Sequence, residues 1–389
     1  MQPPSDERAP KALVAWYGAA VGSLSLGPWM AVTLTDAGLA PSVASLLLAV
    51  LPLSRLVGGP VWAWLADRHR PERVVRGAVV LGAVASLALL VVRDRWLVVG
   101  ALLTWALSRA PVFPIVDATT VDRLGSRYGR VRAIGSLGFL LAVGLGGWLR
   151  DLHPAAPTWI AAALTCLTAA LTWTLPPMAR NDRRPAPTEL VGLLRDPVLA
   201  SFGAAATLHG AGLSIYDTLF AVRVEALGLP SSVAGSAIAC AVGAEVLVMA
   251  AAPRFLGRWD ARGLLALSTV AGVPRLLLTG LITDPVALVL LQGLHGLHFA
   301  TFWLAATVLL AERAPPGLRH STQSLLPVTA FGAGPVLGLL LATALLGNDA
   351  GAAGTSVLFA VGAALALGAS VLAVVSARGP RPAIPGRSG

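Results

Sequence analysis

Long apolar segments recur along the whole of this 389-residue chain, and they constrain its fold more than any other feature. A helix of about 20 apolar residues crosses a hydrocarbon core about 30 Å thick, and twelve segments of roughly that length can be drawn here. Hydrophobic residues make up 56% of the chain and charged residues only 12%, which is not the balance of a water-soluble domain. The sequence therefore predicts an all-α integral membrane protein with twelve transmembrane helices.

The twelve predicted spans divide evenly around one longer hydrophilic connection, Pro176 to Asp196. Their ranges are 12–33, 42–64, 74–92, 96–116, 133–149 and 158–175, then 197–219, 231–253, 264–282, 285–310, 321–346 and 355–376. Two six-helix bundles are the plan of many secondary transporters, whose substrate site lies between the bundles. We therefore predict an N-terminal bundle at 1–177, a cytoplasmic linker at 178–196, a C-terminal bundle at 197–378 and a cytoplasmic tail at 379–389.

Arginine residues indicate the orientation of the spans, because short cytoplasmic loops collect positive charge. If the chain starts inside, the connections after even-numbered spans carry most of the arginines, as around Arg68, Arg130 and Arg183. The connections on the opposite face hold only Arg93, Arg95, Arg150 and Arg223. We therefore predict a multi-pass protein of the cell inner membrane with both termini in the cytoplasm.

The charge distribution and the motif content exclude several classes of function. The formal net charge is +10, but the basic residues are scattered among short loops, which argues against a nucleic-acid partner. The sequence contains no HExxH, no Walker loop and no Cys–His constellation, and Cys166 and Cys240 fall inside predicted helices. We therefore predict no enzyme activity, no cofactor and no metal site. The expected partners are a small-molecule substrate, protons and the bilayer, and we expect a monomer.

The segment GGPVWAWLADRHRPERVV, from Gly58 to Val75, follows the second predicted span. It resembles the loop signature of the major facilitator superfamily, with Asp67 and Arg68 at the expected positions and Ala63 where that family has a glycine. In that family the aspartate meets a helix N-terminus of the other bundle and helps to close the cytoplasmic side. Alternatively, these charges only orient the second and third helices.

The segment VDATT at 116–120, followed by YGRVR and GSLGF, resembles helices four and five of the lactose permease and its phenylpropionate and nucleoside relatives. The resemblance implies that Asp117 and Arg132 bind polar groups of the substrate. Phe139 stands where the lactose permease has a tryptophan that stacks on the galactoside, so we do not expect galactoside transport. An acid and an arginine in a half-wet cleft offer acceptors and a fork of donors. Arg132 could instead be a charge anchored at the membrane edge.

Four polar residues of the second half lie inside predicted spans, where a charge costs about 2.5–3.5 kcal/mol on insertion scales. They are Glu245, Arg275, His295 and His298. Their order resembles the proton-coupling row of the lactose permease, although His298 replaces the glutamate that releases the proton there. Glu245 would then be the acid that carries the proton. In the structural alternative, Glu245 and Arg275 form a buried pair that joins helices, and the histidines only bond to helix neighbours.

Three further charges inside the spans need partners. Arg55 and Arg109 should face the interior and find an acid or backbone carbonyls, and Asp117 is a candidate partner for one of them. Asp217, next to Tyr216, resembles an acid of the permease's seventh helix, but the lysine that neutralises it there has no counterpart here. We therefore expect Asp217 to be solvated near the outer end of its helix.

Together these patterns predict a secondary active transporter that uses alternating access. We expect proton symport of a small polar or aromatic organic solute, such as a sugar, a nucleoside or an aromatic acid. Two alternatives stay open: a non-transporting membrane receptor or regulatory protein on the same fold, and a proton-driven efflux transporter.

Overall fold

The computed structural model describes residues 8–53, 70–124, 128–178, 192–193, 195–251, 259–314, 322–323, 325–346 and 351–376, and these residues form helices and no strands. In the first half the helices are α1 (Arg8–Gly22), η1 (Ser23–Trp29), α2 (Met30–Asp36), a helix at Pro41–Leu53, α4 (Pro71–Val91), α5 (Arg95–Ser108), α6 (Val112–Leu124), α7 (Tyr128–Arg150) and α8 (Ala156–Thr172). In the second half they are α10 (Pro197–Ala226), α11 (Ser231–Ala250), α13 (Ala261–Leu281), α14 (Pro285–Leu291), η3 (Gly296–Ala300), α15 (Thr301–Arg313), α17 (Leu325–Val328), η4 (Thr329–Ala333), α18 (Gly334–Leu346) and α19 (Ala352–Ser376).

Each predicted span overlaps one of these helices or several that follow each other in the chain. Within the described residues, eight helices are long and apolar enough to cross a membrane. The first span consists of α1, η1 and α2, and the fourth consists of α5 and α6. The all-helical fold predicted from the apolar segments is therefore confirmed.

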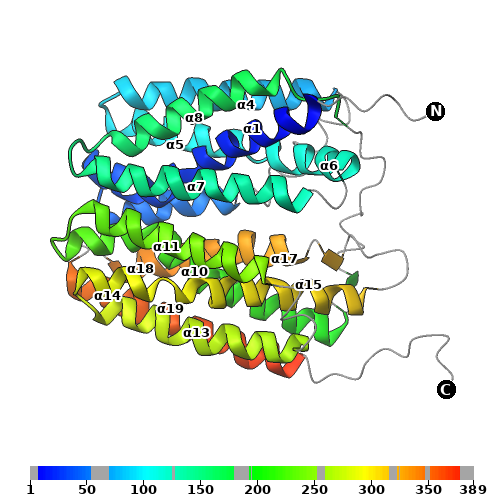
Figure 1. The fold of residues 1–389 in the computed structure, drawn as a ribbon. Helices are drawn as coiled ribbons and strands as arrows, with labels where there is room; N and C mark the ends of the chain where they lie inside the picture. Colours follow the sequence, from blue (N-terminus) through cyan, green and yellow to red (C-terminus); the bar gives the residue numbers. More distant parts are fainter. Residues whose placement is uncertain are drawn as a thin grey trace, which may run out of the picture.

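The helices form two bundles that face each other (Figure 1). Helices α1 and α4 to α8 lie in one bundle, and α10 to α19 lie in the other. The bundles meet mainly where α7 packs against α11 and where α10 packs against η1 and α2. This contact places the centre of the molecule between halves of the chain that are far apart in the sequence.

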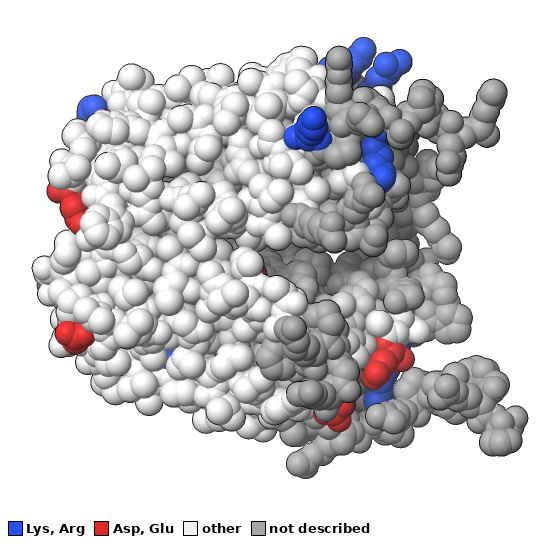
Figure 2. Space-filling model, in the orientation of Figure 1, with Lys and Arg blue, Asp and Glu red and all other residues white. Residues whose placement is uncertain are grey.

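The surface between the two ends of the helices is apolar, as a lipid-facing surface must be. In Figure 2 the Lys, Arg, Asp and Glu side chains gather near two opposite ends, and the broad band between them is almost free of charge. Val84, Leu141 and Val371 are 61%, 60% and 58% exposed within this kind of surface. Such exposure of large apolar side chains is stable in a bilayer and not in water.

Aspartate N-caps begin several of the helices. An aspartate at the N-cap position accepts hydrogen bonds from free backbone N–H groups at the start of four helices: Asp94, Asp196, Asp260 and Asp284. Such a cap is worth about 1 kcal/mol. Gly228, with a φ of 70°, ends the turn that follows α10, a conformation that favours glycine. These features fix where α5, α10, α13 and α14 begin and where α10 ends.

Irregular helical turns interrupt three spans near the middle of the molecule. The first span contains the 3₁₀ segment η1, and the tenth and eleventh contain the π-helical segments η3 and η4. Pro28 of η1, Phe299 of η3 and Phe331 of η4 all line the same cavity. Because π-turns inside helices are frequent at functional sites, these interruptions direct attention to that cavity.

Glycines allow α7 to approach its neighbours closely. A Cβ at Gly138 would lie 2.4 Å from the carbonyl oxygen of Gly18 in α1, and one at Gly147 would lie 2.6 Å from the Cα atom of Gly235 in α11. The spacing of small residues along this helix predicts such close packing. Helix α7 therefore contacts its own bundle and the opposite bundle, and it needs glycine for both contacts.

Candidate functional site

A cavity of about 370 Å³ lies between the bundles and is lined by both. The first half contributes apolar residues that include Met30, Leu48 and Phe139. The second half contributes the polar lining residues, which are Ser214, Tyr216, Asp217, Thr218, Glu245 and His295. In Figure 2 the molecule is hollowed between its two halves. A cavity lined by both aromatic rings and carboxylates can bind a small organic solute.

Asp117 and Arg132 are not among the described lining residues of this cavity. The carboxylate of Asp117 accepts a hydrogen bond from the hydroxyl group of Tyr17, which also lies 3.3 Å from the Thr120 hydroxyl. The guanidinium of Arg132 lies 5.5 Å from the centre of the Phe113 ring. Tyr17 had no role in the sequence-based prediction, since it lies 100 residues from Asp117.

Glu245 lines the cavity, and its Oε2 atom is 3.8 Å from Nε2 of His295, which also lines it. Glu245 is close enough to Asp217 in its own bundle, and to Arg132 in the other bundle, for their charges to interact. The carboxylate thus links the cavity wall to the cluster around Asp117 and Arg132. The structure brings together three of the residues selected from the sequence: Arg132, Glu245 and His295.

Arg275 is completely buried, and its partners are neutral groups. Its Nε atom donates to Oε1 of Gln292 at 2.9 Å, its Nη1 atom is 3.4 Å from Nδ1 of His298, and its guanidinium carbon lies 3.9 Å from the centre of the Tyr216 ring. Asp217 is near enough for its charge to interact with the guanidinium. Within the described residues Arg275 makes no ion pair with Glu245, so the buried pair considered from the sequence does not form.

His298 packs deeper than His295 and faces a histidine that the sequence-based prediction did not include. Its ring meets His209 edge to face at 4.8 Å between centres, and His209 stacks on Phe302 at 3.7 Å. The backbone carbonyl of His298 accepts a hydrogen bond from Ser268. The only sequence signal for His209 is a polar residue inside an apolar span. In the described part of the chain, no group of three His, Cys, Asp or Glu residues could hold a metal ion.

Asp217 requires a correction. Its side chain is exposed, as expected, but it lines the cavity beside Tyr216 instead of lying near the outer end of α10. The reason is the length of α10, which runs for 30 residues and therefore places Asp217 nine residues before its end. Its neighbour Tyr216 is only 2% exposed, and the Tyr216 hydroxyl has no hydrogen-bond partner among the described residues.

Arg109 was expected to bind either an acid or backbone carbonyls, and it binds a backbone carbonyl. It donates to the backbone carbonyl of Ala20 at 2.7 Å and to the hydroxyl of Ser23, and it lies 4.8 Å from the centre of the Trp105 ring. Asp117, its candidate partner, is instead bonded to Tyr17. Arg55, Asp67 and Arg68 lie outside the described residues.

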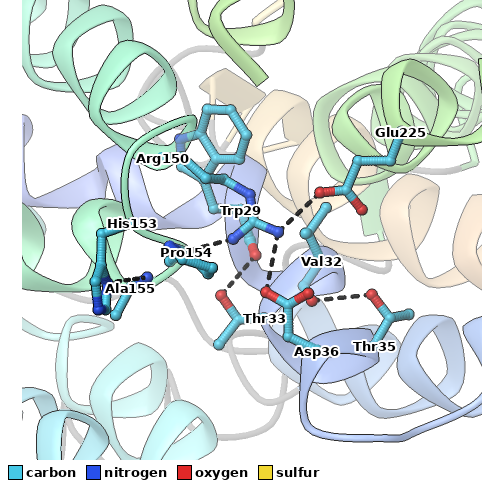
Figure 3. Close-up of polar contacts among 10 residues, drawn as sticks. All are labelled: Trp29, Val32, Thr33, Thr35, Asp36, Arg150, His153, Pro154, Ala155 and Glu225. Carbon is cyan, nitrogen blue, oxygen red and sulfur yellow. Dashed lines mark hydrogen bonds and ion pairs between the residues drawn. The ribbon is translucent and has the colours of Figure 1, made fainter. Parts of the chain in front are cut away.

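One end of the molecule is held closed by Arg150, at the end of α7 (Figure 3). Its Nη2 atom is 2.9 Å from Oδ2 of Asp36 and 2.8 Å from Oε1 of Glu225, and its Nη1 atom donates to the carbonyl of Pro154. Asp36 ends α2 in the same bundle, whereas Glu225 lies in α10 of the opposite bundle. We call this end the Arg150 face. Arg150 is 8% exposed, so a cation assigned to a surface loop is in fact a buried contact between bundles.

Three further hydrogen bonds join the bundles at the Arg150 face. The carboxylate of Asp151 accepts from the backbone N–H groups of Ser231 and Ser232, at 2.6 and 3.0 Å, at the start of α11. The indole nitrogen of Trp148 donates to the hydroxyl of Ser236 at 3.2 Å. A carboxylate is well placed at a helix N-terminus, where the free N–H groups and the helix dipole both favour negative charge. The bundles are therefore in contact on this side of the cavity.

Two helical bundles around a shared cavity define a membrane transporter of the major facilitator type. The comparison with known families agrees, because residues 11–356 match the MFS_1 like family, and the chain belongs to it. It is 28% identical over 265 residues to the maltose permease of Geobacillus stearothermophilus. The match covers 64% of this chain and 66% of the permease, so it spans just under two thirds of the permease. It is 27% identical over 303 residues to a probable 3-phenylpropionic acid transporter of Escherichia coli K12, covering 74% and 78%.

Solved structures show the same fold. The crystal structure of the nucleoside transporter NupG superimposes with a TM-score of 0.77 at 18% identity, covering 95% of this chain and 98% of that one. A bacterial homologue of the human lysosomal transporter Spinster, in an inward-facing and occupied conformation, gives a TM-score of 0.65 at 14% identity, covering 97% and 96%. The predicted fold of twelve transmembrane helices in two bundles is thereby confirmed, and the chain is a multi-pass membrane protein.

Proposed function

We propose that this secondary transporter couples the movement of a small organic solute to the movement of protons, by alternating access to the cavity between its bundles. The observation that carries the proposal is Glu245, a carboxyl group inside the membrane that lines the cavity 3.8 Å from His295. An acid in this position can exchange a proton with water in the cavity when one side opens. Intramembrane acids and histidines of this kind are common in proton-coupled transporters.

The solute class follows from the lining and from the relatives. Maltose and 3-phenylpropionic acid, the solutes in the names of two relatives, are small organic molecules with polar or aromatic groups. The cavity offers both kinds of contact, with the Phe139 ring from the first bundle and polar groups from the second. We assign Phe139 to the solute's apolar face. We assign Asp117 and Arg132 to its polar groups.

The remaining assignments extend the same proposal. His295 lies 3.8 Å from Glu245, and Arg275, which contacts His298, is near enough to Asp217 for their charges to interact. We assign Arg275, His295 and His298 to setting the charge of the two carboxylates. Asp67 and Arg68 close the cytoplasmic side when the cavity opens outward. The protein acts as a monomer in the inner membrane, with both termini in the cytoplasm.

The test uses purified protein in proteoliposomes, screened with a disaccharide, a nucleoside, an aromatic acid and an aromatic amine. We expect an imposed pH gradient to drive accumulation of one of these solutes. Glu245→Gln mimics the protonated acid, so it should keep the exchange of labelled solute between two loaded sides but lose the accumulation. Glu312→Gln, which changes an exposed glutamate of α15, is the matched control and should leave both unchanged.

Three outcomes would contradict the proposal in different ways. Accumulation by Glu245→Gln would move the proton to another residue, with Asp117 the next candidate. Binding of a solute without flux would favour the receptor alternative. Uptake that requires the opposite pH gradient would favour proton-driven efflux.

A further inference from the structure

The wall of the cavity carries negative charge. Asp217 and Glu245 line it, and its described lining residues include no Lys or Arg. Arg132 of the other bundle is close enough to interact with the charge of Glu245 but is not a described lining residue. The two carboxylates are close enough for their charges to repel. A positively charged ligand between them relieves this repulsion, and an anion increases it.

The nearest buried cation of this bundle cannot contact a ligand. Arg275 is completely buried and lies against the ring of Tyr216, which is itself a lining residue. The guanidinium therefore lowers the cost of the charge on Asp217 from behind the wall. A ligand in the cavity meets the Tyr216 ring and the Asp217 carboxylate, and not the guanidinium.

Polar atoms of the wall are left without partners inside the protein. In the described residues the carboxylate of Asp217 has no hydrogen bond, while Glu245 faces His295. The Tyr216 hydroxyl and Nδ1 of His295 also lack partners there, and these residues are 2% and 7% exposed. A buried polar atom without a partner costs about 1–3 kcal/mol, so a ligand that bonds to the Tyr216 hydroxyl or to Nδ1 of His295 gains that energy. The Asp217 carboxylate is exposed and therefore open to a ligand.

Aromatic rings stand beside these polar atoms. The His295 ring stacks on Phe299 at 5.4 Å between centres, and Phe299 meets Phe331 edge to face at 6.2 Å. Phe139 lines the cavity from the other bundle. Such rings bind another aromatic ring by stacking, and their faces attract a cation.

We propose that the cavity binds a ring-bearing amine in its protonated form. Asp217 accepts hydrogen bonds from the ammonium group, beside the Tyr216 hydroxyl, and the rings of Phe299 and Phe331 hold the aromatic part. Glu245, which faces His295, makes no bond to the ammonium group and stays available for the proton. This inference names the solute class of the proposed transport function and rests on that function for its role, although binding itself needs no turnover.

The charge pattern predicts an order among solutes of equal shape. An amine forms a charge-assisted bond to Asp217, an alcohol of the same length forms a neutral one, and a carboxylic acid places a second anion against the wall. The amine should therefore bind most tightly and the acid least tightly.

Tryptamine, tryptophol and indole-3-propionate test this order, because they share one ring system and differ in the charge of the end group. Calorimetric titration of the purified full-length protein at neutral pH should show tryptamine binding about tenfold tighter than tryptophol, with indole-3-propionate weakest. Asp217→Asn should lower the affinity for tryptamine to that for tryptophol and leave tryptophol unchanged. Asp284→Asn, which keeps the N-cap of α14, is the control and should change neither.

Equal affinity for tryptamine and tryptophol, tighter binding of the acid, or no binding of tryptamine would each overturn the inference. The wild-type order decides the matter even if Asp217→Asn fails to fold. Transport is a separate result: a protein that binds tryptamine without moving any solute contradicts the transport proposal alone. One that moves a neutral solute and ignores tryptamine contradicts this inference alone.

Discussion

Removing the ion pair between Arg150 and Glu225 should open the Arg150 face. Glu225→Gln deletes the charge that joins α7 to α10 across the bundles, and Asp36→Asn deletes a similar bond that stays within one bundle. The two variants remove one charge each from the same guanidinium. They therefore separate the contact that joins the bundles from the contact that only holds Arg150 in place.

The free energy that this ion pair contributes follows from the burial of its two side chains. A hydrogen bond between charged groups is worth about 1.5–3 kcal/mol when both are buried, and an exposed ion pair about 0–1 kcal/mol. Arg150 is 7% exposed in its side chain, whereas the Glu225 carboxylate is 36% exposed, which places this pair between those limits. We take about 1–1.5 kcal/mol, which changes the ratio of closed to open molecules about five- to tenfold.

Distances between spin labels on the two bundles measure this ratio. The two free cysteines, Cys166 and Cys240, are first replaced by alanine, and labels are placed at Leu152 and Leu281, which are 81% and 62% exposed. Electron–electron double resonance should show a larger population of long distances in Glu225→Gln than in the parent. Asp36→Asn should show a smaller change. Identical distance distributions in the parent and Glu225→Gln would refute a closing role for this ion pair.

Two further predictions test the packing and the topology. Gly272→Ala places a Cβ 2.3 Å from Cδ2 of buried His298, so it should lower the unfolding free energy by about 1–2 kcal/mol. Gly100→Ala is the control, because a Cβ there has no neighbour within 4 Å, and it should not lower the unfolding free energy. Equal melting temperatures of the two variants would contradict this packing. Reporter fusions after Ala179 and after Gly379 should both report the cytoplasm, because the arginine bias is the same along the chain, and a periplasmic signal at either would break the predicted orientation.

The helices could be predicted from the sequence because each is fixed by its own composition. The length of an apolar run and an aspartate at its start, as at Asp196 and Asp284, are local features. The irregular turns η1, η3 and η4 could not be predicted in this way, because they depend on how neighbouring helices pack. The fourth span, drawn as one helix, is divided into α5 and α6 for the same reason.

The sequence could indicate which residues belong to the candidate site, but it could not indicate which residues they contact. A charged or polar residue inside an apolar run is costly, and this cost alone selected Glu245, Arg275 and His295. Their partners could not be deduced, since Arg275 contacts Tyr216 from a different helix, 59 positions earlier in the chain, instead of Glu245. Arg150 was assigned only to a loop because its acids lie 114 and 75 residues away. Contacts of that range are set by the tertiary fold.

Helix α7 is an unbroken helix of 23 residues, whereas the first, tenth and eleventh spans contain irregular turns. Phe139 in the cavity and Arg150 at the closed end are eleven residues apart on it, a distance of about 16 Å along the axis. Both residues belong to one helix, so a tilt of α7 as a rigid body would move the Phe139 wall of the cavity and the Arg150 guanidinium together. The cavity wall and the contact that closes one side are in this way connected by one helix, α7.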